Sequence, residues 1–114
     1  MEPNAAPRAH FDETLRLIGA GLLAEAESCC LAALGAHPDD INLRALLGAL
    51  LVKQDRRAEA EVTLRKVIEE APEFAKPLED LGYLLVTTGR PAEALPFLER
   101  ATQLDPSLER AWFN

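Results

Sequence analysis

The chemically most reactive side chains of this sequence are two adjacent cysteines, Cys29 and Cys30, because thiolates are common zinc ligands and catalytic nucleophiles. Neighbouring residues of a helix point about 100° apart, so a disulfide between them is not expected. Two thiols alone make a weak metal or redox site. We interpret both cysteines as structural residues and expect them to be reduced.

Histidines and glycines provide the other candidates for chemistry. His10 lies in an amphipathic segment, where we expect a partly buried structural histidine rather than a ligand. His37 directly precedes Pro38, and we expect it to be solvated in a turn. Gly19 and Gly21 lie between two helical patterns, not between a strand and a helix, so they do not form a phosphate-binding loop. The sequence therefore predicts no enzyme activity, cofactor or metal for this chain.

Composition narrows the class of protein further. The chain has 114 residues, 48% of them hydrophobic, and is rich in Ala, Leu and Glu, which favours packed helices. A net charge of −7 argues against binding to nucleic acid or to an anionic membrane. The most apolar stretch, LRALLGALLV, has half of the roughly 20 residues of a membrane span. Without a secretory signal pattern, a cytoplasmic location is predicted.

A constant sequence period organises the chain. Pro38, Pro72 and Pro106 are separated by a 34-residue step, and three alanines, Ala26, Ala60 and Ala94, repeat it. Gly48 and Gly82 follow the same step. A constant step without insertions indicates a stacked array of repeats.

Each repeat contains two stretches with helical spacing of apolar residues, separated by a short turn. Pro91 suits the first turn of a helix, whereas Pro96 lies deeper and is expected to loosen or kink its helix. The pattern predicts six helices, at 9–20, 23–36, 41–54, 57–70, 75–88 and 91–104. Within a pair, Gly48 and Gly82 should allow close approach of the partner helix, with Ala60 and Ala94 as the opposing surfaces.

These residues resemble the signature of the tetratricopeptide repeat (TPR) family. The third copy carries Leu78, Leu81, Gly82, Leu85, Ala94, Leu98 and Pro106 on the family's spacing. The resemblance implies an all-α helix-turn-helix solenoid of three 34-residue repeats. The expected divisions are a flexible N-terminus at 1–6, a degenerate first repeat at 7–40, and further repeats at 41–74 and 75–108.

Residues 109–114, ERAWFN, are interpreted as the truncated start of a fourth repeat. Trp112 lies one 34-residue step beyond Leu78, where the family often carries tryptophan. The chain would then be an N-terminal piece of a longer protein. The wording of the repeats is also similar to TPR regions that precede sulfotransferase domains in some bacterial proteins.

The resemblance implies a concave wall formed by the first helix of each repeat. Such a wall suits an amphipathic helix or an extended apolar peptide. Its predicted partner-binding residues are Arg8, Phe11, Leu15, Ile18, Asn42, Ala45, Ala49, Val52, Lys76, Glu79, Tyr83 and Val86.

Two alternatives stay open for this wall. Phe11, Leu15 and Ile18 would instead face the core if the first helix were rotated, because Glu13 and Thr14 are poor core residues. Lys76 and Tyr83 would alternatively be ordinary surface residues. TPRs that grip a C-terminal carboxylate use Lys, Asn and Arg on this wall, and the corresponding places here hold Phe11, Leu15, Leu46, Lys76 and Asp80. A receptor for such tails is therefore not expected.

The favoured function is a scaffold that binds a peptide or helix of a partner protein. The alternatives are a regulatory or substrate-presenting module of a larger enzyme, a sulfotransferase first, and a homo-oligomerisation element. An uncovered last helix pair predicts weak dimerisation through the C-terminal end, with Leu98, Trp112 and Phe113 as the contact residues.

Overall fold

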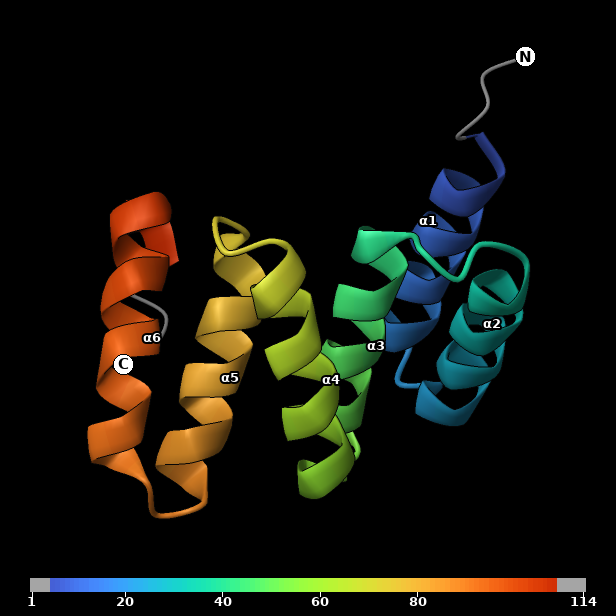
Figure 1. Ribbon diagram of the computed structural model, residues 1–114. Coiled ribbons are helices and arrows are strands. Elements are labelled where there is room, and N and C mark those ends of the chain that lie inside the picture. Colours follow the sequence, from blue (N-terminus) through green and yellow to red (C-terminus); the bar gives the residue numbers. More distant parts are fainter. Residues whose placement is uncertain (1–4, 109–114) are drawn as a thin grey trace.

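The computed structural model describes residues 5–108, which form six α-helices and a short 3-10 helix. The elements are α1 (Ala5–Gly19), α2 (Leu23–Ala36), α3 (Ile41–Lys53), α4 (Arg57–Glu70), α5 (Ala75–Thr87), α6 (Pro91–Leu104) and η1 (Pro106–Leu108). Figure 1 shows the three helix pairs, α1–α2, α3–α4 and α5–α6, one after another along the molecule from right to left. The all-α helix-turn-helix solenoid predicted from the sequence is confirmed.

The helices form two layers. Within each repeat the two helices pack as a pair, and the first helices also pack against one another, α3 lying against both α1 and α5. The described second helices, α2, α4 and α6, make no comparably extensive contacts among themselves. The first helices therefore form the inner, concave layer, and the second helices form the outer layer with grooves between them.

Five of the six helices begin and end within one residue of the predicted positions. The exception is α1, which begins at Ala5 rather than at residue 9, and the first four residues of the predicted N-terminal segment lie outside the described chain. Pro7 lies in the first turn, where its missing N–H leaves no hydrogen bond unmade. α6 continues through Pro96, so this proline does not end the helix, and a kink at this position stays a prediction.

The turns between paired helices repeat one backbone motif. Gly21, Asp55 and Gly89 are related by the 34-residue step, and their φ angles are 79°, 60° and 79°. The next residue in each turn donates its N–H to a carbonyl five residues earlier, as Arg90 does to Leu85 at 2.8 Å. This left-handed helix end favours glycine, so Asp55 is the one strained member among the three.

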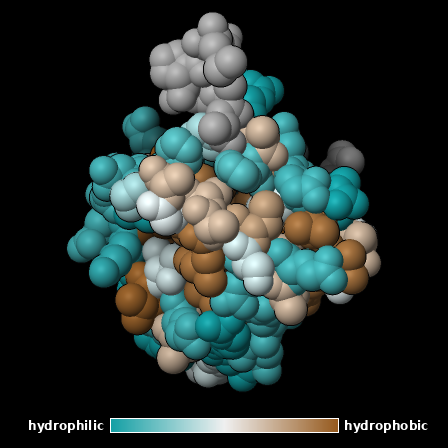
Figure 2. All heavy atoms as spheres, turned by 90° about the vertical axis from the view of Figure 1, so that its right-hand side faces the viewer, coloured by the Kyte–Doolittle hydropathy of each residue, from teal (hydrophilic) through white to brown (hydrophobic). Residues whose placement is uncertain are grey.

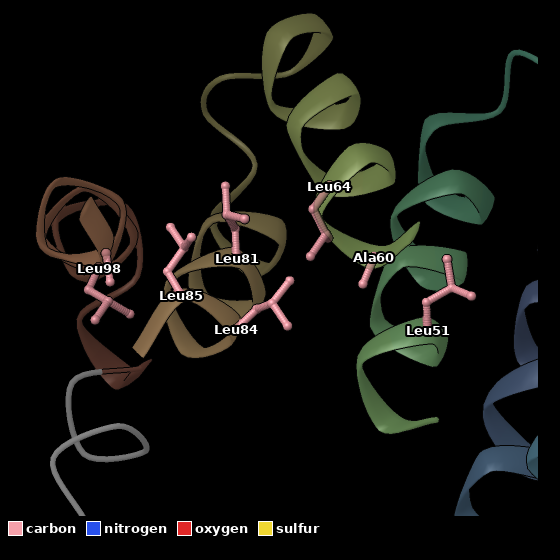
Figure 3. Close-up of a cluster of buried hydrophobic side chains, with 8 residues drawn as sticks. Leu51, Ala60, Leu64, Leu81, Leu84, Leu85 and Leu98 are labelled. Carbon is pink, nitrogen blue, oxygen red and sulfur yellow. The ribbon is translucent and has the colours of Figure 1, made fainter. Parts of the chain in front are cut away.

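Close packing within a pair depends on glycine. A Cβ atom on Gly82 would lie 2.5 Å from Cγ of Leu98, and one on Gly48 would lie 3.0 Å from Cγ of Leu64. The side chain opposite each glycine is therefore a leucine, not Ala60 or Ala94 as predicted, although both alanines are buried. The leucines of α5 point towards α6 on one side and α4 on the other (Figure 3).

The first repeat keeps the same orientation with different residues. Thr14 and Leu17 are buried, whereas Leu15 is exposed, so the alternative of a rotated first helix is wrong. The hydroxyl of Thr14 donates to the carbonyl of His10 at 2.7 Å, which satisfies a polar group that would otherwise be buried without a partner.

Candidate functional site

The predicted inner-face residues occupy three levels of exposure. Arg8, Leu15, Asn42, Lys76, Tyr83 and Val86 are exposed, and Phe11, Ile18, Ala49, Val52 and Glu79 are half-buried. Ala45 is buried, so its side chain is not available to a partner. Among the large apolar residues of this wall, Leu15, Tyr83 and Val86 are the most exposed, at 45%, 56% and 47% of their surface.

Stacking of the repeats explains the differences along the wall. α3 has first helices on both sides, and Val52 packs against the core cluster that includes Leu84 and Leu85 of α5. Tyr83 and Val86 lie on α5, which has such a neighbour on one side only within the described chain. The apolar surface therefore lies towards the two ends of the wall, with the smaller α3 residues between them.

A compact charged cluster lies beside Tyr83 on α5. Nζ of Lys76 is 2.9 Å from Oε1 of Glu79 and 2.8 Å from Oδ1 of Asp80. The two carboxylate side chains are largely buried, whereas Lys76 is 60% exposed. One ammonium group therefore pairs with two carboxylates, and the positive charge of Lys53 also acts on Asp80.

The cluster leaves polar atoms unsatisfied. Oε2 of Glu79 and Oδ2 of Asp80 are buried and accept no hydrogen bond from the described residues. Burial raises the pKa of Asp80 above its ordinary value, although Lys76 acts in the opposite direction. Lys76 and Glu79 are thus held in an ion cluster, and a contact of Lys76 with a partner stays a prediction.

α1 carries a polar residue at a position where the other first helices carry an apolar one. Leu47 and Leu81 pack into the core between repeats, and the corresponding residue of the first repeat is Glu13. Its carboxylate pairs with Arg16 at 2.5 Å on the surface. Figure 2 looks onto this end of the molecule and shows apolar side chains in the middle of a largely hydrophilic face.

The cysteines and histidines do not converge on a site. Cys30 is buried in the core, where its Sγ lies 3.4 Å from the carbonyl of Leu43 and burial raises its pKa to about 11. Cys29 is half-buried, and both thiols are free. Contrary to the predictions, His10 is exposed and His37 is half-buried. Within the described residues no group of three or more potential ligands could hold a metal ion.

Comparison with protein families decides the identity of the repeats. Two tetratricopeptide repeat models match, one over residues 17–81 and one over residues 75–114. The chain belongs to the tetratricopeptide repeat family. No curated protein matches this TPR sequence.

Solved TPR structures share the fold. A mutant of the Thermobaculum terrenum O-GlcNAc transferase matches with a TM-score of 0.88 at 25% identity, over 97% of this chain and 21% of the other. The chain thus spans about a fifth of that transferase. The second TPR of Spaghetti (RPAP3), bound to an HSP90 peptide, matches with a TM-score of 0.79 at 19% identity, over 90% and 94% of the two chains. YrrB, a TPR protein with an unusual peptide-binding site, matches with a TM-score of 0.76 at 20% identity. This match covers 93% of this chain and 53% of YrrB.

The residues predicted for self-association lie on α6 and at the C-terminal end. The self-association prediction placed Leu98 on the exposed outer face of α6. This was wrong, because Leu98 is buried against Gly82. The exposed leucine of α6 is Leu95. Trp112 and Phe113 lie outside the described residues, and dimerisation through this end stays a prediction.

A feature that sequence reasoning missed connects successive TPRs. Arg56 bonds to Glu27 of the preceding repeat at 2.7 Å and to Glu59 of its own repeat at 2.8 Å. Arg90 repeats the arrangement with Glu61 and Glu93, both at 2.8 Å. Hydrogen bonds from these arginines lower the pKa of Glu27 and of Glu61. The signal was present in the sequence, because both Arg56–Arg90 and Glu27–Glu61 follow the 34-residue step.

The outer layer contains an apolar groove between α2 and α4. It has a volume of about 520 Å³, with Leu47 and Leu51 among its lining residues and the Arg56 ion pairs at its edge. Leu31 and Val62 line it while exposing 48% and 59% of their surface. Of the helices described, none is long and apolar enough to cross a membrane.

Proposed function

We propose that this TPR chain is a protein-interaction module that binds a peptide or helix of a partner protein along its inner face. The observation that carries the proposal is the exposure of Leu15, Tyr83 and Val86 on the first helices, since large exposed apolar side chains on a concave surface favour an apolar ligand. The TPR family is generally non-catalytic. Peptide binding by similarly folded RPAP3 and YrrB supports the same class of function.

The chemistry of the wall favours an apolar ligand over an acidic one. Of the places that hold a carboxylate clamp in some TPRs, Leu46 is buried and Asp80 is itself a carboxylate paired with Lys76. A C-terminal carboxylate placed there would lie close to the carboxylates of Asp80 and Glu79, and Lys76 already pairs with both. We expect the ligand to carry apolar residues for Tyr83 and Val86, and no acidic residue near Asp80.

Mutations of exposed residues test the site without disturbing the core. A library of 12-residue peptides is selected on the wild-type chain, and the binders are measured on Tyr83→Ala/Val86→Asp. Val52 is unsuitable for this purpose, because it packs against the core. We expect a loss of affinity of at least about tenfold, equivalent to 1.4 kcal/mol, with unchanged helicity.

Glu99→Ala, an exposed change on α6, serves as the matched control and should leave binding unchanged. Equal binding to wild type and to the double variant would move the site away from the inner face.

A second candidate is a module within a larger enzyme. Its support is the match to about a fifth of an O-GlcNAc transferase chain. In that case the inner face would present a protein substrate or a regulatory segment to a catalytic domain elsewhere in the polypeptide. The enzyme in this match is not a sulfotransferase, and that connection stays a proposal, as does a cytoplasmic location. The domain content of the full-length protein distinguishes the two candidates, because only the second requires a catalytic domain.

A further inference from the structure

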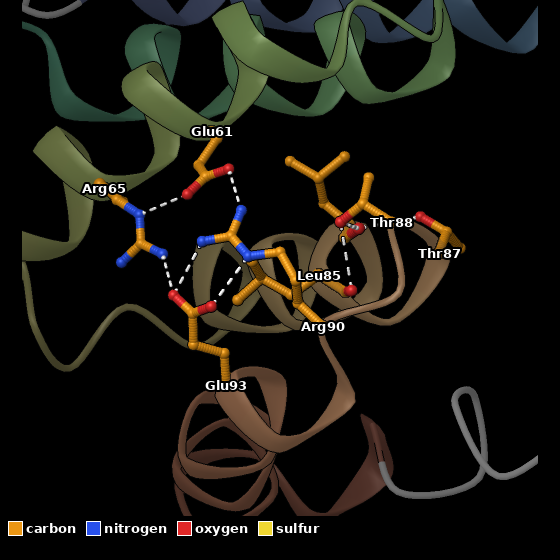
Figure 4. Close-up of polar contacts among 8 residues, drawn as sticks. Glu61, Arg65, Leu85, Thr87, Thr88, Arg90 and Glu93 are labelled. Carbon is orange, nitrogen blue, oxygen red and sulfur yellow. Dashed lines mark hydrogen bonds and ion pairs between the residues drawn. The ribbon is translucent and has the colours of Figure 1, made fainter.

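The two junctions between successive repeats differ on the outer face. At the second junction, between α4 and α6, the half-buried ring of Phe97 packs against the core cluster. The guanidinium group of Arg65 lies over this ring, 5.6 Å from its centroid. Arg65 also pairs with Glu61 at 2.9 Å and with Glu93 at 3.2 Å. Arg90 pairs with the same two glutamates, so this cluster contains two arginines and two glutamates (Figure 4).

The 34-residue step identifies the corresponding residues at the first junction. Glu27, Arg56 and Glu59 reproduce the ion pairs, but Thr63 replaces the phenylalanine and Leu31 replaces the second arginine. The first junction therefore lacks one aromatic ring and one positive charge. The side-chain amide of Gln54 donates a hydrogen bond to Glu27 at 3.1 Å but carries no charge. The cluster of Glu27, Arg56 and Glu59 therefore has a net charge of −1.

The missing residues leave a longer groove. At the first junction the groove extends from the apolar side chains to the ion cluster and is lined by Glu27, Arg56 and Glu59. At the second junction a groove of about 430 Å³ is lined by Phe97 and Arg65, but not by Glu61, Arg90 or Glu93. Phe97 and Arg65 occupy the places that correspond to Thr63 and Leu31, and the groove that they line does not reach the ion cluster.

We propose that the groove between α2 and α4 is a second docking site, which takes a partner segment that carries an aromatic side chain next to an arginine or lysine. The ring would contact Leu31, Leu51 and Val62 in the place that Phe97 holds one repeat later. The cation would pair with Glu59 and Glu27, as Arg65 pairs with Glu93 and Glu61. A cation over an aromatic ring and a charge-assisted hydrogen bond to a partly buried carboxylate both favour this pair of residues.

The site is separate from the inner face. Its lining residues come from α2, α3, α4 and Arg56 at the start of α4, and none belongs to the set predicted for the concave wall. The charge of −1 disfavours an acidic segment, and the exposed Leu31 and Val62 disfavour a purely polar one. A bivalent partner could occupy both surfaces without competition between its two segments.

Closing the groove within the chain provides the test. In Leu31→Arg/Thr63→Phe, the first junction receives the residues of the second. A library of 12-residue peptides is selected on immobilised wild-type chain while an excess of this soluble variant removes peptides that bind elsewhere. We expect the surviving peptides to carry an aromatic and a basic residue within about one helical turn, that is about four residues, of each other. They should bind the wild type at least tenfold more tightly than the variant.

Amide chemical shifts of the labelled wild-type chain provide a readout that does not depend on the folding of the variant. The surviving peptides should perturb Leu31, Val62 and Thr63 and leave Tyr83 and Val86 unchanged. The proposal would be overturned by the absence of surviving peptides, by survivors without an aromatic and basic pair, or by shifts centred on the inner face. Tyr83→Ala/Val86→Asp is the control variant and should retain full binding of these peptides.

Discussion

The first and third repeats build the same helix pair from residues of different size. In the third repeat, the smallest side chain, Gly82, faces Leu98, and an added Cβ atom would lie 2.5 Å from Cγ of that leucine. In the first repeat, the corresponding positions hold the larger Thr14 and the smaller Cys30, and both are buried. The departure of the first repeat from the TPR signature is therefore compensated in volume, and its packing is preserved.

The strongest test of this compensation is a transfer of residues between the two repeats. Gly82→Thr should lower the free energy of unfolding by about 3 kcal/mol, because the new side chain overlaps with Leu98. Adding Leu98→Cys, which recreates the pair of the first repeat, should recover part of the loss. Chemical denaturation of the two single variants and the double variant gives the coupling energy, expected at about 0.5–3 kcal/mol.

Thr14→Gly is the matched control in the first repeat and should cost about 1 kcal/mol, because it removes a hydrogen bond and contacts without causing overlap. Strict additivity of Gly82→Thr and Leu98→Cys would contradict the compensation between the two positions.

A smaller effect is expected from the charged cluster of the third repeat. Because burial raises the pKa of Asp80, the folded state binds a proton more tightly than the unfolded state, and stability from this group decreases as the pH rises through its pKa. Asp80→Asn removes this penalty. The variant should be more stable than wild type at pH 7, with the difference disappearing in acid.

Asp12 holds the equivalent place in the first repeat and is exposed, so Asp12→Asn should change the melting temperature at neither pH. A loss of stability in Asp80→Asn at pH 7 would show that the pairing with Lys76 outweighs the cost of burial.

The smallest expected effect concerns the turns. Asp55 adopts a φ angle of 60° where the first and third repeats have Gly21 and Gly89. Asp55→Gly should therefore relieve backbone strain and raise the free energy of unfolding by about 0.5 kcal/mol, after loss of its exposed ion pair with Arg57. Thermal melts of Asp55→Gly and of Gly89→Ala should shift in opposite directions. A lower melting temperature for Asp55→Gly would indicate that its side chain stabilises the turn.

The fold could be predicted from the sequence, because the residues that repeat every 34 positions determine where each helix begins and ends. The positions of Pro38, Pro72 and Pro106 and the spacing of the leucines determined five of six helices to within one residue. The start of α1 was not predicted, because Pro7 is compatible with both a loop and a first helical turn.

The candidate site was harder to predict from the sequence, because the exposure of a side chain depends on how neighbouring repeats stack. Periodicity assigned Ala45 and Tyr83 to one wall, yet α3 lies between two helices and Ala45 is buried. Similarly, Leu98 belongs to the outer helix but fills the space left by Gly82. The Arg–Glu pairs between repeats depend on side-chain reach across a junction, although their regular spacing was visible in the sequence.

Amide chemical-shift mapping tests the central proposal, binding along the inner face, most directly. A peptide selected on the Leu31→Arg/Thr63→Phe variant, in which the groove between α2 and α4 is closed, is titrated into the labelled wild-type protein. We expect the largest shifts at Leu15, Tyr83 and Val86, with affinity lost in Tyr83→Ala/Val86→Asp and retained in Leu31→Arg/Thr63→Phe. Shifts confined to α2, α4 and α6, with the inner face unchanged, would contradict the proposed function.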